Sequence, residues 1–122
     1  MAKVLLVDRN ISQGNILADS IKGPGKEVAV VHSVEEAVAI FKRETFDLVL
    51  LDVSSETDPA AAVRHVRESA ATVSEKRIPL VVVTKSFSDS SFLLDSGEVD
   101  VLLECPAHVT QLQQVVEQFV GC

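Results

Sequence analysis

The chain has 122 residues and a formal net charge of −7 at pH 7, and 47% of its residues are hydrophobic and 24% charged. This length and composition predict one folded domain spanning residues 1–122, whereas the acidic charge argues against direct nucleic-acid binding, which relies on Lys and Arg. Apolar runs of four or five residues are too short for a membrane span, the N-terminus does not resemble a secretory signal, and two cysteines without a disulfide framework favour the cytoplasm.

Five short apolar runs predict strands that are buried on both faces. The runs are rich in Val and Leu and are mostly unbroken rather than alternating, which is typical of a parallel sheet. In chain order they cover residues 4–7, 28–31, 48–51, 80–83 and 99–103.

Segments with the spacing of amphipathic helices follow each of these runs. In chain order they begin near Ile11, Val34, Pro59, Ser88 and Leu112. Two of them open with a capping box, formed by Ser33 with Glu36 and by Thr110 with Gln113. The fourth segment is rich in Ser and poor in helix formers, so we expect it to be short or mobile. Five alternating strands and helices predict an α/β fold with a doubly wound parallel sheet.

Polar side chains follow three of the predicted strands. Asp8 follows the first strand, Asp52 the third and Thr84 the fourth. In doubly wound folds, ligands bind beyond the carboxyl ends of the strands, so we expect these side chains to converge there. Two carboxylates and a hydroxyl suit a hard cation or a phosphoryl group. Alternatively, Asp residues at strand ends cap the following turn or helix.

These segments resemble the receiver domain of two-component response regulators over nearly the whole chain. LLVDRN resembles the first strand of that family, FDLVLLD the third, IPLVVVT the fourth, and VDVLLECPA the fifth strand with its turn. The resemblance implies a flavodoxin-like (βα)5 fold with a five-stranded sheet in the order 2-1-3-4-5.

The resemblance also assigns expected roles to single residues. Asp52 stands at the phospho-acceptor position and Thr84 at the phosphoryl-sensing hydroxyl. Pro106 stands at the family's proline, which implies a cis peptide bond. The metal ligands of the family would fall on Asp8, Asp52 and the backbone carbonyl of Ser54.

Three positions depart from the family pattern. Arg9 stands where the family has its second acid, the main side-chain ligand for magnesium. Cys105 replaces the Lys that holds the phosphoryl group, and Leu102 replaces the aromatic residue that reports activation. A missing carboxylate and an added cation predict a magnesium site that is weak or empty. We expect Arg9 to pair with Asp8 or Asp52 and so relieve their mutual repulsion, although Arg9 could instead point outward as a surface charge.

Other residues offer weaker candidates for a site. Glu56 and Asp58 lie in the loop after the third strand, and either could fold back as a substitute metal ligand, but we favour a solvated acidic loop. Lys85 is next to Thr84 and could partly replace the absent Lys, although neighbouring residues of a strand point to opposite faces. Cys105 and His108 lack a second pair of ligands for zinc.

The sequence therefore predicts an atypical receiver that serves signal transduction as a phosphorylation-independent protein-interaction module, and not as an enzyme. We expect protein partners from a signalling pathway, such as a sensor kinase or a fused output domain, and neither nucleic acid nor membrane. One alternative is a working receiver that is phosphorylated on Asp52 with weak or unusual magnesium dependence. Another is a small-molecule-binding flavodoxin-like domain, but DRNISQG lacks the G-x-G-x-x-G spacing of a phosphate loop, so we expect no cofactor.

Overall fold

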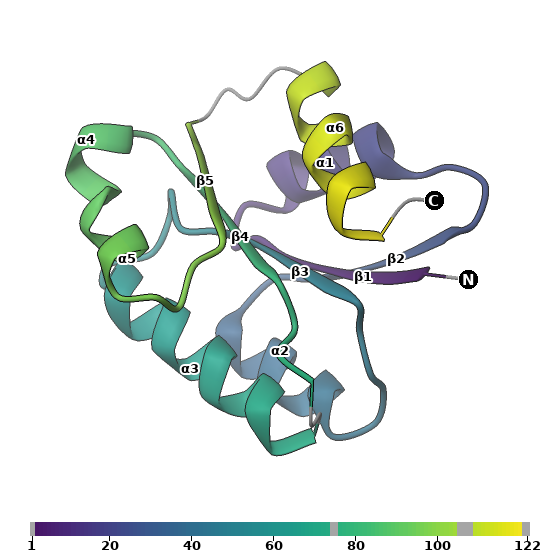
Figure 1. The fold of residues 1–122 in the computed structure, drawn as a ribbon, viewed down its shortest axis with the longest axis horizontal. Coiled ribbons are helices and arrows are strands. Elements are labelled where there is room, and N and C mark those ends of the chain that lie inside the picture. Colours follow the sequence, from purple (N-terminus) through teal and green to yellow (C-terminus); the bar gives the residue numbers. More distant parts are fainter. Residues whose placement is uncertain (1, 74–75, 105–108, 121–122) are drawn as a thin grey trace.

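The five apolar runs form one parallel sheet in the computed structural model, which describes residues 2–73, 76–104 and 109–120 (Figure 1). The strands lie side by side in the order β2-β1-β3-β4-β5, which confirms the predicted doubly wound topology. They are β1 (Ala2–Val7), β2 (Lys26–Val31), β3 (Leu48–Asp52), β4 (Leu80–Thr84) and β5 (Val101–Glu104).

Helices cover both faces of this sheet (Figure 1). They are α1 (Ile11–Ile21), α2 (Val34–Phe41), α3 (Pro59–Val73), α4 (Phe87–Ser90), α5 (Phe92–Asp95) and α6 (Val109–Val120). Two four-residue helices, α4 and α5, form in the Ser-rich segment, which agrees with the prediction of a short helix there. No helix within the described ranges is long and apolar enough to cross a membrane.

Neighbouring residues of β1 enter two different hydrophobic cores. Val4 and Leu6 pack in the core that α1 and α6 cover. Leu5 and Val7 pack in the core that α2, α3 and α5 cover. Both side-chain directions of the strand are therefore buried, which explains why its sequence is continuously apolar rather than alternating.

Capping residues fix where α2 and α3 begin. The Ser33 hydroxyl accepts a hydrogen bond from the Glu36 N–H at 3.0 Å, as the first predicted capping box requires. Pro59 begins α3, and the preceding Asp58 accepts a hydrogen bond from the Ala61 N–H at 3.1 Å.

The second predicted capping box is wrong in its position. The last helix begins at Val109, one residue before Thr110, so Thr110 lies inside the helix and not at its cap. Gln113 Nε2 instead donates to the backbone carbonyl of Ser20 at 2.8 Å. This hydrogen bond is a tertiary contact between α6 and α1.

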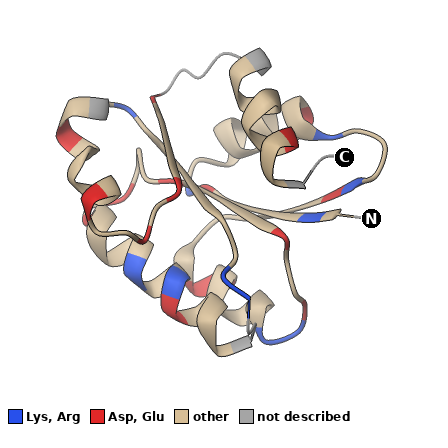
Figure 2. Cartoon of the chain, in the orientation of Figure 1, with Lys and Arg blue, Asp and Glu red and all other residues tan. Residues whose placement is uncertain are grey.

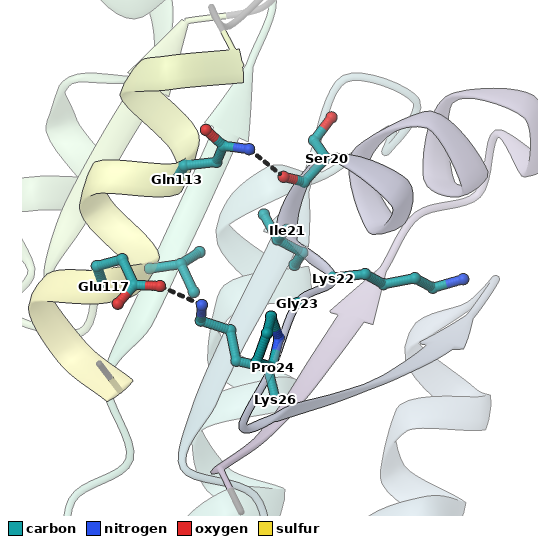
Figure 3. A pocket seen from close by; sticks show the side chains of 9 residues that line it. Ser20, Ile21, Lys22, Gly23, Pro24, Lys26, Gln113 and Glu117 are labelled. Carbon is teal, nitrogen blue, oxygen red and sulfur yellow. Dashed lines mark hydrogen bonds and ion pairs between the residues drawn. The ribbon is translucent and has the colours of Figure 1, made fainter. Parts of the chain in front are cut away.

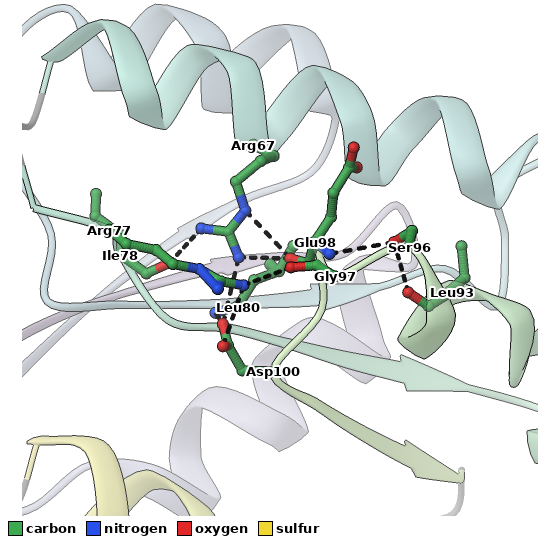
Figure 4. A network of polar contacts seen from close by, with 9 residues as sticks. All are labelled: Arg67, Arg77, Ile78, Leu80, Leu93, Ser96, Gly97, Glu98 and Asp100. Carbon is green, nitrogen blue, oxygen red and sulfur yellow. Dashed lines mark hydrogen bonds and ion pairs between the residues drawn. The ribbon is translucent and has the colours of Figure 1, made fainter.

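An arginine network fastens α3 to the segment that leads into β5 (Figure 4). The guanidinium of Arg67 donates to the carbonyls of Ile78 and Glu98 and lies 3.3 Å from Asp100 Oδ2. Arg77 pairs with the other oxygen of Asp100 at 3.2 Å. Burial is the largest cause that lowers the pKa of Arg67, followed by the neighbouring charge of Arg77. The network therefore fixes the segment between α5 and β5 against α3.

Charged residues are scattered over the helices and loops (Figure 2). In this view, Lys and Arg are interspersed with Asp and Glu along the ribbon. The polar groups that the sequence singled out lie instead at the carboxyl edge of the sheet, where three neighbouring strands end.

Candidate functional site

Three buried polar side chains lie at the carboxyl ends of neighbouring strands. Asp8 directly follows β1, Asp52 ends β3 and Thr84 ends β4. Their exposed fractions are 1%, 3% and 4%, in a layer that is otherwise apolar. The structure thus brings these three predicted site residues to one edge of the sheet, while their roles stay predictions.

The backbone around Asp8 holds its carboxyl group in one place. The Asp8 N–H donates to the carbonyl of Val31 at 3.0 Å, and Asp8 Oδ1 accepts from the Asn10 N–H at 2.9 Å. Gly14 lets α1 approach closely, because a Cβ atom at that position would lie 3.2 Å from the Cβ of Asp8. The Asn10 side chain then caps α1 by accepting from the Gln13 N–H.

The chemistry of Asp8 is set by its burial and by Asp52. Burial raises the pKa of Asp8 most, and a hydrogen bond to Asp52 and the charge of Asp52 add to this, so that the pKa reaches about 7. The Asn10 N–H lowers it, and the charge of Glu56 raises it slightly further. Burial and a neighbouring carboxylate both disfavour the charged form of Asp8. The Asp8 carboxyl group is therefore only partly ionised near neutral pH.

Two buried oxygens near this pair have no hydrogen-bond partner among the described residues. They are Asp8 Oδ2 and the hydroxyl oxygen of Ser54. The backbone N–H of Ser54 donates to Asp52 Oδ1 at 2.8 Å, which fixes the start of the loop after β3. An unsatisfied buried carboxylate oxygen is costly, and it marks the place where a further ligand or proton is needed.

The predicted pairing of Arg9 with Asp8 or Asp52 is wrong. Arg9 Nε instead donates to Glu56 Oε2 at 2.8 Å, and Arg9 Nη2 lies 3.9 Å from Glu35 Oε2. Arg is long and flexible enough to reach an acid on another loop rather than the acid beside it in the sequence. The guanidinium is therefore engaged by Glu56 and not by the carboxyl groups of Asp8 and Asp52.

The prediction for the loop after β3 is right for one acid and wrong for the other. Asp58 is exposed and caps α3, as a solvated loop acid would. Glu56 folds inward, and only 7% of its side chain is exposed. The Asp58–Pro59 pair that follows Glu56 is a helix-start signal, which assigns Asp58 to the cap of α3, and this signal could have identified Glu56 as the acid left for the site.

Thr84 is held by the short helix that follows it. Its Oγ1 atom lies 2.8 Å from the Ser90 hydroxyl, and both side chains are buried. The Ser86 N–H also donates to Thr84 Oγ1 at 3.3 Å. The sequence analysis did not single out Ser90, because nothing distinguishes it from the other serines of that segment.

Removing the Ser90 hydroxyl should loosen this contact. We expect Ser90→Ala to lower the free energy of unfolding by about 1 kcal/mol, since one buried hydroxyl pair is lost. Ser88→Ala is the matched control, because Ser88 is exposed and its hydroxyl lies 3.2 Å from that of Ser86, at the surface; it should change stability by less than about 0.5 kcal/mol. Urea denaturation followed by circular dichroism measures both, and equal effects would contradict a special role for Ser90.

The remaining candidates divide into described and undescribed residues. Leu102 is buried in the core against which α2 and α3 pack, and Lys85 is exposed beside Thr84. The predicted roles of Cys105 and of a cis bond before Pro106 lie outside the described residues.

The residues at this edge fit a divalent cation poorly. Magnesium prefers near-octahedral oxygen ligands and usually one or two carboxylates besides water. Asp8 offers an unpartnered oxygen, but its raised pKa leaves it partly protonated near pH 7, and Glu56 is engaged by Arg9. Within the described ranges, no group of three or more His, Cys, Asp or Glu side chains is arranged to hold a metal.

A separate hollow of about 280 Å³ lies at the opposite edge of the sheet (Figure 3). It is formed by the end of α1, the turn into β2 and one side of α6. Lys26 forms an ion pair with Glu117 across it, and Gln113 bonds to Ser20. None of the predicted site residues lines this hollow.

Comparison with known sequences gives homology over almost the whole chain. Over 118 residues the chain is 30% identical to the transcriptional regulatory protein ZraR of Salmonella typhimurium, and likewise to ZraR of Escherichia coli. The match covers 94% of this chain and 25% of those proteins, so the chain spans about a quarter of their length. No model of a protein family matches the chain.

Comparison with solved structures gives the same fold. The receiver domain of the sensor histidine kinase PA1611 of Pseudomonas aeruginosa, solved with magnesium in its active-site cleft, matches with a TM-score of 0.78 at 22% identity, over 99% of this chain and 98% of that one. The phosphorylated cyanobacterial phytochrome response regulator RcpA matches with a TM-score of 0.72 at 26% identity, over 98% and 93% of the two chains. The sequence homology, the strand order and the shared fold together place this chain in the family of receiver domains of two-component response regulators.

Proposed function

We propose that this receiver domain acts as a protein-interaction module whose state does not depend on phosphorylation of Asp52. The observation that carries the proposal is the pairing at the carboxyl edge of the sheet. Burial and Asp52 raise the pKa of Asp8 to about 7, and Arg9, which replaces an acid, is held by Glu56. Phosphoryl transfer relies on a metal ion to offset the developing charge. A pocket in which Asp8 is partly protonated and Glu56 is engaged by Arg9 should bind such an ion weakly, so phosphorylation should be slow or absent.

The residues that would report phosphorylation support the same proposal. The hydroxyl of Thr84 is engaged by Ser90. Leu102 is an aliphatic core residue where the family has an aromatic switch. An aliphatic side chain without a polar end has no hydrogen bond to exchange between an inward and an outward position. A partner protein would therefore recognise a single conformation that does not change with phosphorylation.

The proposed partners are proteins of a signalling pathway. A sensor kinase or an output domain fits a family whose members pass signals between such proteins, and the matched ZraR proteins are about four times as long as the matched segment. We propose that the domain acts by binding these partners and catalyses no reaction of its own. Small-molecule binding is the competing proposal from another class, and a ligand that co-purifies would appear as added mass in native mass spectrometry.

Treatment of the natural chain with acetyl phosphate and magnesium tests the proposal. We expect its intact mass to stay unchanged over the time in which a phosphorylatable receiver domain, treated in parallel, becomes labelled. The Asp52→Asn variant is the matched control for labelling at other residues. A phosphoryl group that appears on the natural chain and not on Asp52→Asn would refute phosphorylation independence. That result would support the alternative proposal of a working receiver with unusual magnesium dependence. The buried positions of Asp52 and Thr84 at the strand ends are compatible with this alternative.

A further inference from the structure

Arg9 and Glu56 form a partly buried ion pair beside the Asp8–Asp52 pair. They come from two different loops, Arg9 from the one between β1 and α1 and Glu56 from the one between β3 and α3. Glu56 is almost fully buried, while 42% of the Arg9 side chain is exposed. Both lie near Asp8, since Arg9 follows it directly in the chain and the charge of Glu56 acts on its pKa.

The two charges of this pair depend on each other. A buried carboxylate without a counter-ion is strongly unfavourable, so Glu56 can lie inside only while Arg9 is beside it. Arg9 stays charged at every relevant pH, so the pair forms without metal and without titration of the guanidinium. Glu35 of α2 also lies 3.9 Å from Arg9, but 79% of its side chain is exposed and it is screened by water.

We propose that Arg9 keeps a divalent cation out of the Asp8–Asp52 site by engaging Glu56, which would otherwise be the third carboxylate of that site. The guanidinium binds Glu56 and so links the loop after β1 to the loop after β3. Glu56, because it is engaged by Arg9, is withheld from Asp8 and Asp52 as a third carboxylate. Asp8 Oδ2, which is buried and has no hydrogen-bond partner among the described residues, is the oxygen at which a further ligand or a proton would be bound.

This inference rests on the proposed function and makes a prediction of its own. Removal of the guanidinium should free Glu56 and leave three carboxylates and no cation around one pocket. Such a set suits magnesium better than the two carboxylates of the natural chain. Removal of both members of the pair should return the pocket to two carboxylates, so the gain of metal binding should be lost again.

The test is magnesium binding at pH 8, without any phosphodonor, by isothermal titration and by the shift of the melting temperature. The natural chain should show no shift at millimolar magnesium, and Arg9→Ala should be stabilised increasingly as magnesium is added. The double variant Arg9→Ala/Glu56→Gln should bind at least about tenfold more weakly than Arg9→Ala. Arg9→Ala/Glu35→Gln is the matched control and should bind as Arg9→Ala does, because Glu35 is a surface acid. Arg9→Lys, which keeps the charge, should behave like the natural chain.

Three results would overturn the proposal. Equal magnesium affinity of the natural chain and Arg9→Ala would show that Arg9 excludes no cation. Equal affinity of Arg9→Ala with and without Glu56→Gln would show that Glu56 is not the withheld carboxylate. If circular dichroism finds Arg9→Ala unfolded without metal, refolding by magnesium supports the proposal, and failure to refold is the third result against it. Labelling of the natural chain by acetyl phosphate would refute the proposed function alone, because none of these measurements involves a phosphodonor.

Discussion

The double variant Arg9→Asp/Cys105→Lys should gain one phosphoryl group on Asp52 when it is treated with acetyl phosphate and magnesium, whereas the natural chain should not. Arg9→Asp restores an acid where the family has its main metal ligand and changes the local charge by two units in favour of a cation. Cys105→Lys restores a donor for the phosphoryl oxygens. Asp8, Asp52 and Thr84 are already buried at the ends of their strands.

The two substitutions should act together rather than separately. The metal ion and the Lys stabilise the same developing charge on the phosphoryl group, so each single variant should be labelled little and the effects should not add. Intact mass spectrometry measures the labelled fraction over time. Asp52→Asn in the double variant is the control and should abolish the label. Equal labelling of the natural chain and the double variant would show that Arg9 and Cys105 do not disable the site.

The position of Glu56 adds a consequence for stability. Arg9→Asp removes the counter-ion of a buried carboxylate and places a further acid near three others. The free energy of unfolding of the metal-free variant should therefore fall. Magnesium should restore it by mass action in the variant and leave the natural chain unchanged.

The framework of the site was predictable from sequence because strand patterns fix direction. Continuous Val and Leu runs indicate strands buried on both faces, and parallel strands bring their carboxyl ends to one edge. Asp8, Asp52 and Thr84 stand directly at those ends, so the backbone alone determines where they lie. For residues that directly end a strand, the predicted strand boundary is therefore enough to predict their place in the fold.

The ion pairs of the site were not predictable in the same way. Arg9 was expected to pair with Asp8 or Asp52 at the edge of the sheet. Its partner Glu56 is instead 47 residues away in the chain and lies on a loop without a periodic sequence pattern. The Thr84–Ser90 contact depends on which serine of a Ser-rich segment turns inward. Arg67 donates to backbone carbonyls, which every residue carries and which leave no mark in the sequence.

Asp8→Asn should make the protein more stable at pH 8 by about 2 to 4 kcal/mol and should flatten the pH dependence of its stability. The pKa of Asp8 is raised from 3.8 to about 7 in the folded chain, mainly by burial and then by Asp52. Between these two values the folded chain binds more protons than the unfolded chain, so the free energy of unfolding of the natural chain falls as the pH rises from about 4 to about 7. Above that range the penalty is fully present, and below it the penalty is absent.

The asparagine removes this penalty while keeping the contacts of the natural residue. Its Oδ1 atom can still accept from the Asn10 N–H, and its amide can donate to Asp52, so the protonated form of Asp8 is mimicked at every pH. Urea denaturation followed by circular dichroism at pH 5 and pH 8 should show the two proteins closer in stability at pH 5 than at pH 8. Asp19→Asn, on the exposed face of α1, should run parallel to the natural chain. A profile of Asp8→Asn that also runs parallel would mean that Asp8 is ionised throughout this range.

Asp52→Asn separates the two causes of the shift. It removes the charge of Asp52 but leaves Asp8 as buried as before, so the pH dependence should shrink without vanishing. Asp8→Asn should therefore flatten the profile more than Asp52→Asn does. The reverse order would mean that the pH dependence of stability does not arise mainly from Asp8.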